Sequence, residues 1–259
     1  MTRPTFLSVA ELKATVLPSM FLDPVQISEY GQTGASSASA LETFQSLMKN
    51  APITVLAAQI SKVVAKLKEA DPKSLTEAPS WLDKVLGRDV EKVVLYKVAR
   101  VTLDELLATA SGAAASVRET VKGLESLIEG HHAEVDQLTA YIEAGNEYLA
   151  ENPSAGEASP GALEFDRPRE RLARKVTNLA ALRAAHEMSE AQMRLTRAQA
   201  MDILDRFNET TTLLVPVWRQ HTMALTNAKS LDPSIVSQAT KAHQALLRSL
   251  QGLEAEQHN

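Results

Sequence analysis

Two histidines stand at positions where a helical seam would otherwise be apolar. His131 and His186 each interrupt a run of apolar residues spaced three or four apart. If the two runs pair antiparallel about residue 158, both imidazoles fall in one core layer. Two imidazoles beside a carboxylate can bind a metal ion, whereas a polar layer without metal would serve to fix the helix register. We expect the register role, and metal binding by His131 and His186 is the alternative.

Other chemically active residues form no established motif. Glu129 precedes His132 by three residues, a spacing found in di-iron bundles, but no second copy occurs. There is no HExxH zinc motif, no common nucleotide-binding loop and no nucleophile elbow. The chain has no cysteine, which excludes disulfides, thiolate catalysis and thiolate metal sites. We therefore expect no enzymatic activity, no catalytic residues and no cofactor.

A third candidate is the stretch TTTLLVPVWRQH at residues 210–221, which lies between helical flanks. Pro216 lacks the N–H that would bond the carbonyl of Thr212, so the spacing predicts a kink. An architectural bend, with the indole beyond the proline packed on the N-terminal helices, is the favoured interpretation. The alternative is a partner, anion or ligand site at the corner, formed by Trp218, Arg219, Gln220 and His221.

Composition narrows the class of protein. Of 259 residues, 44% are hydrophobic, only 4% are aromatic and ten are glycine, which favours helices over sheets. The net charge of −5 argues against a nucleic-acid partner. No apolar run approaches the roughly 18 residues that span a bilayer. The N-terminal stretch is interrupted by Glu11, Lys13 and Pro18, so it does not have the continuous apolar segment expected of a secretory signal. We expect a cytoplasmic protein without membrane association.

Prolines and glycines divide the chain into the elements that must position these residues. We expect an all-α fold, elongated, in which a long antiparallel helical hairpin of coiled-coil type joins a small N-terminal helical bundle. The predicted parts are an N-terminal arm (1–23), short helices (24–87), the hairpin (88–228, loop about 152–168), and a C-terminal helix and tail (229–259). Within 24–87 we expect a helix over 24–49, an apolar stripe from Val55 to Leu67, and a short helix over 77–85. The last helix should cover 233–251.

The hairpin prediction rests on two apolar seams. The first runs through Leu103, Leu107, Ala110, Ala114, Val117, Val121, Leu124, Ile128, His131, Val135, Leu138, Ile142, Gly145 and Leu149. The second runs through Leu172, Val176, Leu179, Leu182, His186, Ser189, Met193, Thr196, Ala200, Ile203, Phe207, Thr210 and Leu214. Steps of three and four over this length are typical of paired long helices. Folding about residue 158 opposes Leu138 with Leu179 and Ala110 with Phe207.

Three short stretches, in order, resemble the toxic anion resistance family (TelA/KlaA proteins, linked to tellurite resistance). They are ISEYG at Ile27–Gly31, AYIEAGNEYL at Ala140–Leu149 and LLVPVWRQ at Leu213–Gln220. The resemblance covers roughly residues 22–229, with Arg219 in place of the usual lysine. Family members usually continue with further helices beyond the position of Lys229.

The resemblance implies a cytoplasmic, helical stress-response protein without an established catalytic mechanism. It carries over no catalytic residue, and it adds Tyr30 to Trp218, Arg219 and Gln220 as a candidate contact. We expect a non-enzymatic protein that acts through contact with a protein partner whose identity the sequence does not give. Self-association into a homo-oligomer is left open. The alternative is a protein that binds an anion or a metal directly, near Pro216 or at the His131/His186 layer.

Overall fold

The computed structural model describes residues 7–32, 36–49, 51–75, 88–156, 167–228 and 232–255. All regular elements in these ranges are helical, so the predicted all-α class is confirmed. Proline is the first residue of several of them and suits that place because its missing N–H would be unsatisfied there anyway. These are η2, α4, η3, α7 and α9. In the described part of the chain, no helix combines the length and the apolar character needed to cross a membrane.

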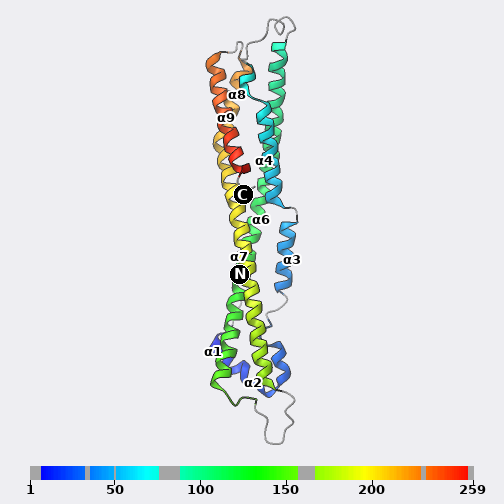
Figure 1. The fold of residues 1–259 in the computed structure, drawn as a ribbon, viewed down its shortest axis with the longest axis vertical. Helices are drawn as coiled ribbons and strands as arrows, with labels where there is room; N and C mark the ends of the chain where they lie inside the picture. The colour runs from blue at the N-terminus through cyan, green and yellow to red at the C-terminus, as the bar shows by residue number, and fades with distance from the viewer. Residues whose placement is uncertain are drawn as a thin grey trace. The chain divides into compact units, whose positions relative to one another are not determined.

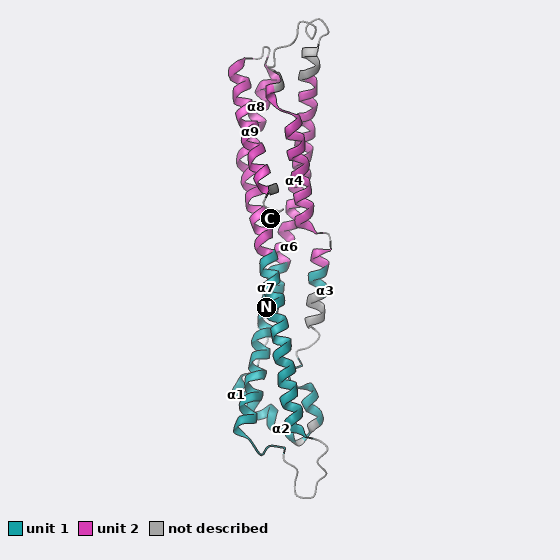
Figure 2. Ribbon diagram, viewed as in Figure 1, with its two compact units in different colours: residues 1–45, 124–196 teal, residues 46–123, 197–259 magenta. Residues whose placement is uncertain are grey.

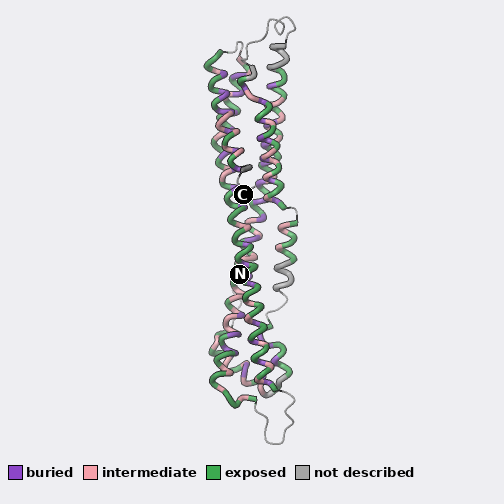
Figure 3. Tube along the Cα trace, in the orientation of Figure 1, coloured by how far each residue is buried: buried purple, intermediate pink, exposed green. Residues whose placement is uncertain are grey.

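The chain divides into two compact units (Figure 2). Unit 1 comprises residues 1–45 and 124–196, and unit 2 comprises residues 46–123 and 197–259. The two long helices, α6 (Arg88–Glu151) and α7 (Pro168–Glu209), each contribute to both units. α6 and α7 correspond to the two seams expected from the sequence. Within each unit, the seam residues of both helices are mostly buried (Figure 3).

Unit 1 surrounds its parts of α6 and α7 with short N-terminal helices. These are α1 (Val9–Glu11), the π-helix η1 (Leu12–Val16), α2 (Leu17–Leu22) and the 3₁₀ helix η2 (Pro24–Glu29). The first turn is a capping box in which Ser8 and Glu11 bond each other's backbone N–H groups. Leu12 and Leu17 are fully buried in the same core cluster as Leu138 and Leu172. Residues 7–23 of the expected N-terminal arm are therefore packed into unit 1.

The helix expected over 24–49 is broken, and this expectation is corrected. The 3₁₀ helix η2 ends at Glu29, and α3 begins only at Ser36 and runs to Met48. Gly31 has φ of +67°, a left-handed conformation that stops a helix and that other residues adopt only with strain. A Cβ at Gly31 would lie 2.5 Å from Leu179 Cδ1, so α7 lies directly against this turn.

Unit 2 is a group of helices around one large core. Its elements are α4 (Pro52–Glu69), the 3₁₀ helix η3 (Pro72–Leu75), the π-helix η4 (Thr210–Leu214), α8 (Val215–Asn227) and α9 (Pro233–Ala255). α9 packs against both α8 and α4, as Figure 1 shows. Leu56 on α4 is fully buried and Val55 is 44% exposed, so the stripe predicted through Val55 passes one residue further along. The short helix predicted over 77–85 lies outside the described residues.

Pro216 is accommodated by a change of helix type. The turn before it, η4, is a π-helix in which the N–H of Val215 bonds the carbonyl of Thr210, five residues earlier. The hydroxyl of Thr211 donates to the carbonyl of Phe207 at 2.9 Å, and that of Thr210 donates to Arg206 O. In place of a simple kink, the helix therefore widens into one π-helical turn before Pro216 and continues directly as α8. The wider turn changes which backbone groups pair near the proline, and the threonine hydroxyls donate to nearby carbonyls.

Unit 1 depends on close approach of α6 and α7 at Gly145. A Cβ there would lie 2.5 Å from Val176 Cγ2, and Val176 is a buried, β-branched residue with little rotamer freedom. We expect Gly145→Ala to destabilise the protein by about 1–3 kcal/mol, because overpacking exceeds the gain in helix propensity. Gly130→Ala is the matched control, since nothing lies within 4 Å of its Cβ position. Urea unfolding should show Gly130→Ala unchanged or stabilised, and equal effects of the two variants would contradict the argument.

His243 gives unit 2 a dependence on pH. Its Nε2 lies 2.9 Å from the carbonyl of Leu67, and the side chain is buried. Burial lowers the pKa of His243, against opposing contributions from Asp71 and from the Leu67 hydrogen bond. In the unfolded chain this histidine has a pKa of about 6.5, so as the pH falls the unfolded chain takes up a proton before the folded chain does. The free energy of unfolding therefore decreases as the pH falls from about 7 toward the pKa of the folded state. Urea unfolding across this range should show a smaller loss for His243→Gln, and an unchanged pH dependence would refute the assignment.

Candidate metal centre

The layer predicted from the two seams exists inside unit 1. His131 Nδ1 on α6 lies 3.0 Å from His186 Nδ1 on α7, which confirms the predicted pairing of these two residues. The rings are tilted at 50° with centroids 5.1 Å apart. The two side chains are 8% and 4% exposed, so the polar layer is part of the packed seam.

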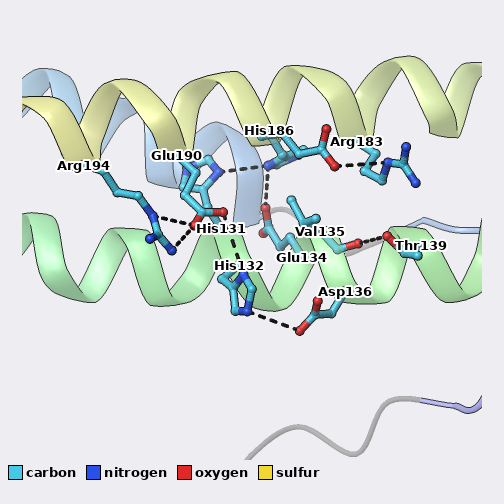
Figure 4. Close-up of polar contacts among 11 residues, drawn as sticks. His131, His132, Glu134, Val135, Asp136, Thr139, Arg183, His186, Glu190 and Arg194 are labelled. Carbon is cyan, nitrogen blue, oxygen red and sulfur yellow. Dashed lines mark hydrogen bonds and ion pairs between the residues drawn. The ribbon is translucent and has the colours of Figure 1, made fainter.

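Glu134 joins the two histidines. It lies one helical turn after His131, and its Oε2 is 3.1 Å from His186 Nδ1 (Figure 4). The three side chains offer ligand atoms that all lie within 4.8 Å of one another. Among the described residues, Glu134 Oε2 is buried and receives no hydrogen bond. A buried carboxylate oxygen in this state is costly unless a proton or a cation compensates it.

Further charges border this layer on one side. Glu190 accepts a hydrogen bond from Arg194 Nε at 2.8 Å, and its other oxygen lies 3.9 Å from His132 Nδ1. Burial and the neighbouring His186 lower the pKa of His131, while Glu134 and Glu190 act in the opposite direction. The neutral imidazole of His131 is therefore favoured, and a neutral imidazole has one nitrogen lone pair available for a ligand.

A pocket of about 220 Å³ lies beside the layer. It is lined by both imidazoles together with Phe44, Leu182, Ala185, Ser189, Gln192 and Met193. Leu182 is 38% exposed and Ser189 is exposed, although both are seam positions. The seam is therefore open at this point on the α7 side, which gives the histidine layer a route to solvent.

The motifs in the sequence point to Glu129 and His132 and not to Glu134. In the structure Glu129 is exposed, and the side chain of His132 is 62% exposed beside Asp136. The signal that identifies Glu134 is its spacing of three residues after His131, which places both on one helix face. That spacing becomes informative only once the face of α6 that meets α7 is known.

Tyr30 lies in the core of unit 1. It is fully buried, its ring packs edge-on against Tyr141 at 5.0 Å, and its hydroxyl donates to the carbonyl of Tyr141 at 2.7 Å. Burial raises its pKa far above the usual range. Its role in this structure is to hold the turn at Gly31 against α6.

The residues beyond Pro216 divide between core and surface in unit 2. Trp218 is 1% exposed and shares the large core with residues of α4 and α9. Gln220 and Arg219 are exposed, and Arg219 Nε bonds Asp104 Oδ1 at 2.6 Å. His221 is half-buried. Of the predicted contact residues, Arg219 and Gln220 are thus accessible to a partner. Trp218 is buried in the core of unit 2 and Tyr30 in the core of unit 1, so neither is accessible.

Comparison with known proteins gives the family. Residues 19–249 match the family described as toxic anion resistance protein (TelA). The chain is 54% identical over 248 residues to Protein KlaA of Escherichia coli, and the alignment covers 95% of this chain and 96% of KlaA. The chain belongs to the toxic anion resistance (TelA) family. No solved structure matches it significantly.

The TelA family match extends beyond the region expected from the three motifs. It continues past Lys229 and includes most of α9. The first two motifs, around Tyr30 and around Tyr141, meet in unit 1, where the two tyrosine rings pack edge-on. A Cβ added at Gly145 would lie 3.5 Å from the Tyr30 ring. Their structural role in this TelA-family chain is to pack η2 onto α6.

The Tyr30 hydroxyl can be tested by removing one atom. We expect Tyr30→Phe to lower the free energy of unfolding by about 1 kcal/mol, because the hydrogen bond to Tyr141 O is lost while the ring stays buried. Tyr148→Phe is the control: its ring packs on Phe21 at 5.3 Å, and among the described residues its hydroxyl makes no hydrogen bond. Chemical denaturation that gives equal losses for both variants would contradict this role of Tyr30.

Proposed function

We propose that this TelA-family protein is a non-enzymatic, cytoplasmic stress-response protein that protects cells from toxic anions such as tellurite by contact with a protein partner. The family supports the resistance role. The absence of cysteine argues against reduction of the anion by the chain itself, since thiolate chemistry is not available. The observation that carries the protein contact is an apolar surface on unit 2.

This surface is the outer face of α8, which we define as Leu213, Val217, Gln220 and Met223. The three apolar members are 58%, 44% and 49% exposed. With Gln220 included, the four residues follow one another at steps of four, three and three, so they line one side of η4 and α8. The opposite side carries the buried residues Val215, Trp218, Thr222 and Leu225. α8 is thus anchored to the core on one side and presents apolar side chains on the other.

The chemistry of the outer face favours a protein surface over lipid or nucleic acid. The only lysine or arginine in α8 is Arg219, and its guanidinium is paired with Asp104. A membrane-surface helix would carry a basic polar face, and a nucleic-acid site would carry several unpaired cations. We therefore assign the outer face of α8 to a partner with a complementary apolar surface.

The paired state of Arg219 also weighs against an anion site at the corner after Pro216. With Asp104 Oδ1 at 2.6 Å, an incoming anion would have to displace or approach a carboxylate. Direct metal binding remains the second candidate function. It is favoured by the convergence of His131, Glu134 and His186 and does not depend on the outer face of α8.

The contact is tested by charging the outer face. We expect Val217→Glu combined with Met223→Glu to lower the tellurite resistance of expressing cells to that of cells without the protein, because a buried contact would then contain two unpaired carboxylates. The free energy of unfolding should change little, since both side chains are exposed. The measurements are the tellurite concentration tolerated by cells and urea unfolding of the purified protein.

Matched variants on α9 control for added charge. Ser237 and Gln238 are exposed in the same unit, so Ser237→Glu with Gln238→Glu adds the same charge on a different helix. This pair should keep wild-type resistance. A photo-crosslinking residue at position 217 should yield an adduct in cells, and its mass distinguishes a second copy of the 28.1 kDa chain from another protein. Full resistance in the α8 double variant would refute the proposal.

A further inference from the structure

We propose that His131, Glu134 and His186 bind one divalent transition-metal ion of the Zn²⁺ class inside unit 1. This inference does not depend on the partner contact of α8, which belongs to unit 2. It rests on the positions of three side chains on two helices and on the chemistry of their ligand atoms.

The spacing of the three ligand atoms is close to that of a zinc site. In a tetrahedral zinc site with bonds of about 2.0–2.2 Å, neighbouring ligand atoms lie about 3.3–3.5 Å apart. The two Nδ1 atoms are 3.0 Å apart, and His186 Nδ1 is 3.1 Å from Glu134 Oε2. Small rotations of the side chains that move each ligand atom outward by a few tenths of an ångström would therefore make room for an ion between the three atoms. Figure 4 shows the three side chains directed toward one another between α6 and α7.

The protons and lone pairs of the three side chains do not match one another in number. A carboxylate only accepts hydrogen bonds, and each neutral imidazole has one N–H and one lone pair. A single proton on His186 Nδ1 would have to serve both His131 Nδ1 and Glu134 Oε2. The Glu134 oxygen is buried and accepts no hydrogen bond within the described ranges. A divalent cation would compensate all three atoms at once and would remove the cost of the buried carboxylate.

The ligand set indicates the class of metal. Two imidazoles and one carboxylate form the protein ligands of many zinc sites that keep a coordination position open. Imidazole nitrogen favours Zn²⁺, Co²⁺ or Ni²⁺ over Mg²⁺ and Ca²⁺, which prefer all-oxygen sites. The pocket lined by both imidazoles provides room for a water molecule in the open position.

The site is built on rigid elements. His131 and Glu134 share one turn of α6, and His186 projects from the middle of α7. All three positions lie within continuous helix, and buried seam residues hold the two helices together further along on either side, at Leu138 and Leu179 and at Leu124 and Met193. Preorganised ligands lose little conformational entropy on binding. A metal ion should therefore bind more tightly here than at a cluster of mobile surface side chains.

The test uses the full, untagged chain after treatment with a chelator. Calorimetric titration with Zn²⁺ should show one equivalent bound. Titration with Co²⁺ should show the visible absorption of a four-coordinate ion with nitrogen and oxygen ligands. Zn²⁺ should also raise the melting temperature, because a ligand that binds only the folded state stabilises it.

Single ligand variants and one neighbour variant make the test specific. His131→Gln, Glu134→Gln and His186→Gln should each weaken Zn²⁺ affinity at least about tenfold, which corresponds to about 1.4 kcal/mol. His132→Gln, an exposed histidine next to the site, should bind as the wild type does. Glu134→Gln is the most informative variant, since it keeps the shape of the side chain and removes the buried charge.

Folding and binding are separated by the stability of the metal-free variants. Metal-free Glu134→Gln should be at least as stable as the metal-free wild type, yet its melting temperature should not rise with Zn²⁺. Failure of the wild type to bind either Zn²⁺ or Co²⁺ would overturn the proposal, as would equal loss of binding in His132→Gln. In that case the three residues would form a polar layer that only fixes the register.

Discussion

The structure depends on the packing of α6 against α7 within each unit along narrow apolar seams. A chain with few aromatic residues has little bulk with which to build a core, so helices must approach closely and neighbouring elements must cover what the seams leave exposed. In unit 1 the approach occurs at Gly145, and the cover is the short N-terminal helices and Tyr30. In unit 2 the cover is α4, α8 and α9, whose apolar side chains complete a larger core.

The histidine layer is a departure from this apolar packing. Buried imidazoles and a carboxylate reduce hydrophobic stabilisation at one level of the seam, and they require partners in exchange. Such a layer can fix which residues of α6 face which residues of α7, since any slip of register would bury these groups among leucines. The same convergence produces a set of ligand atoms. A register role and a metal role are therefore physically compatible at His131, Glu134 and His186.

The outer face of α8 depends on a different constraint. Pro216 cannot donate a backbone hydrogen bond. The π-helical turn over Thr210–Leu214 accommodates the proline, and the helix continues from α7 into α8 without a loop. Because Trp218 and Leu225 anchor one side of α8 in the core, Val217 and Met223 are held outward. The stretch around Pro216 thus places Trp218 in the core and Leu213 and Val217 on the surface. Its most conspicuous residue in the sequence, the tryptophan, is part of the core.

Local chemistry along the chain was enough to predict the helical class, the two long seams, the opposition of His131 and His186, and the proline-led starts of several helices. These features follow from spacing and from residue preferences that act over a few residues. Tertiary packing alone decided that Tyr30 is buried, that Gly31 ends a helix expected to continue, that Leu56 replaces Val55 in the core, and that Glu134 completes the histidine pair, whereas the burial of Trp218 agrees with the architectural interpretation of the Pro216 stretch. The reason is that burial and convergence depend on which helix faces meet, and that is a property of elements distant in the chain.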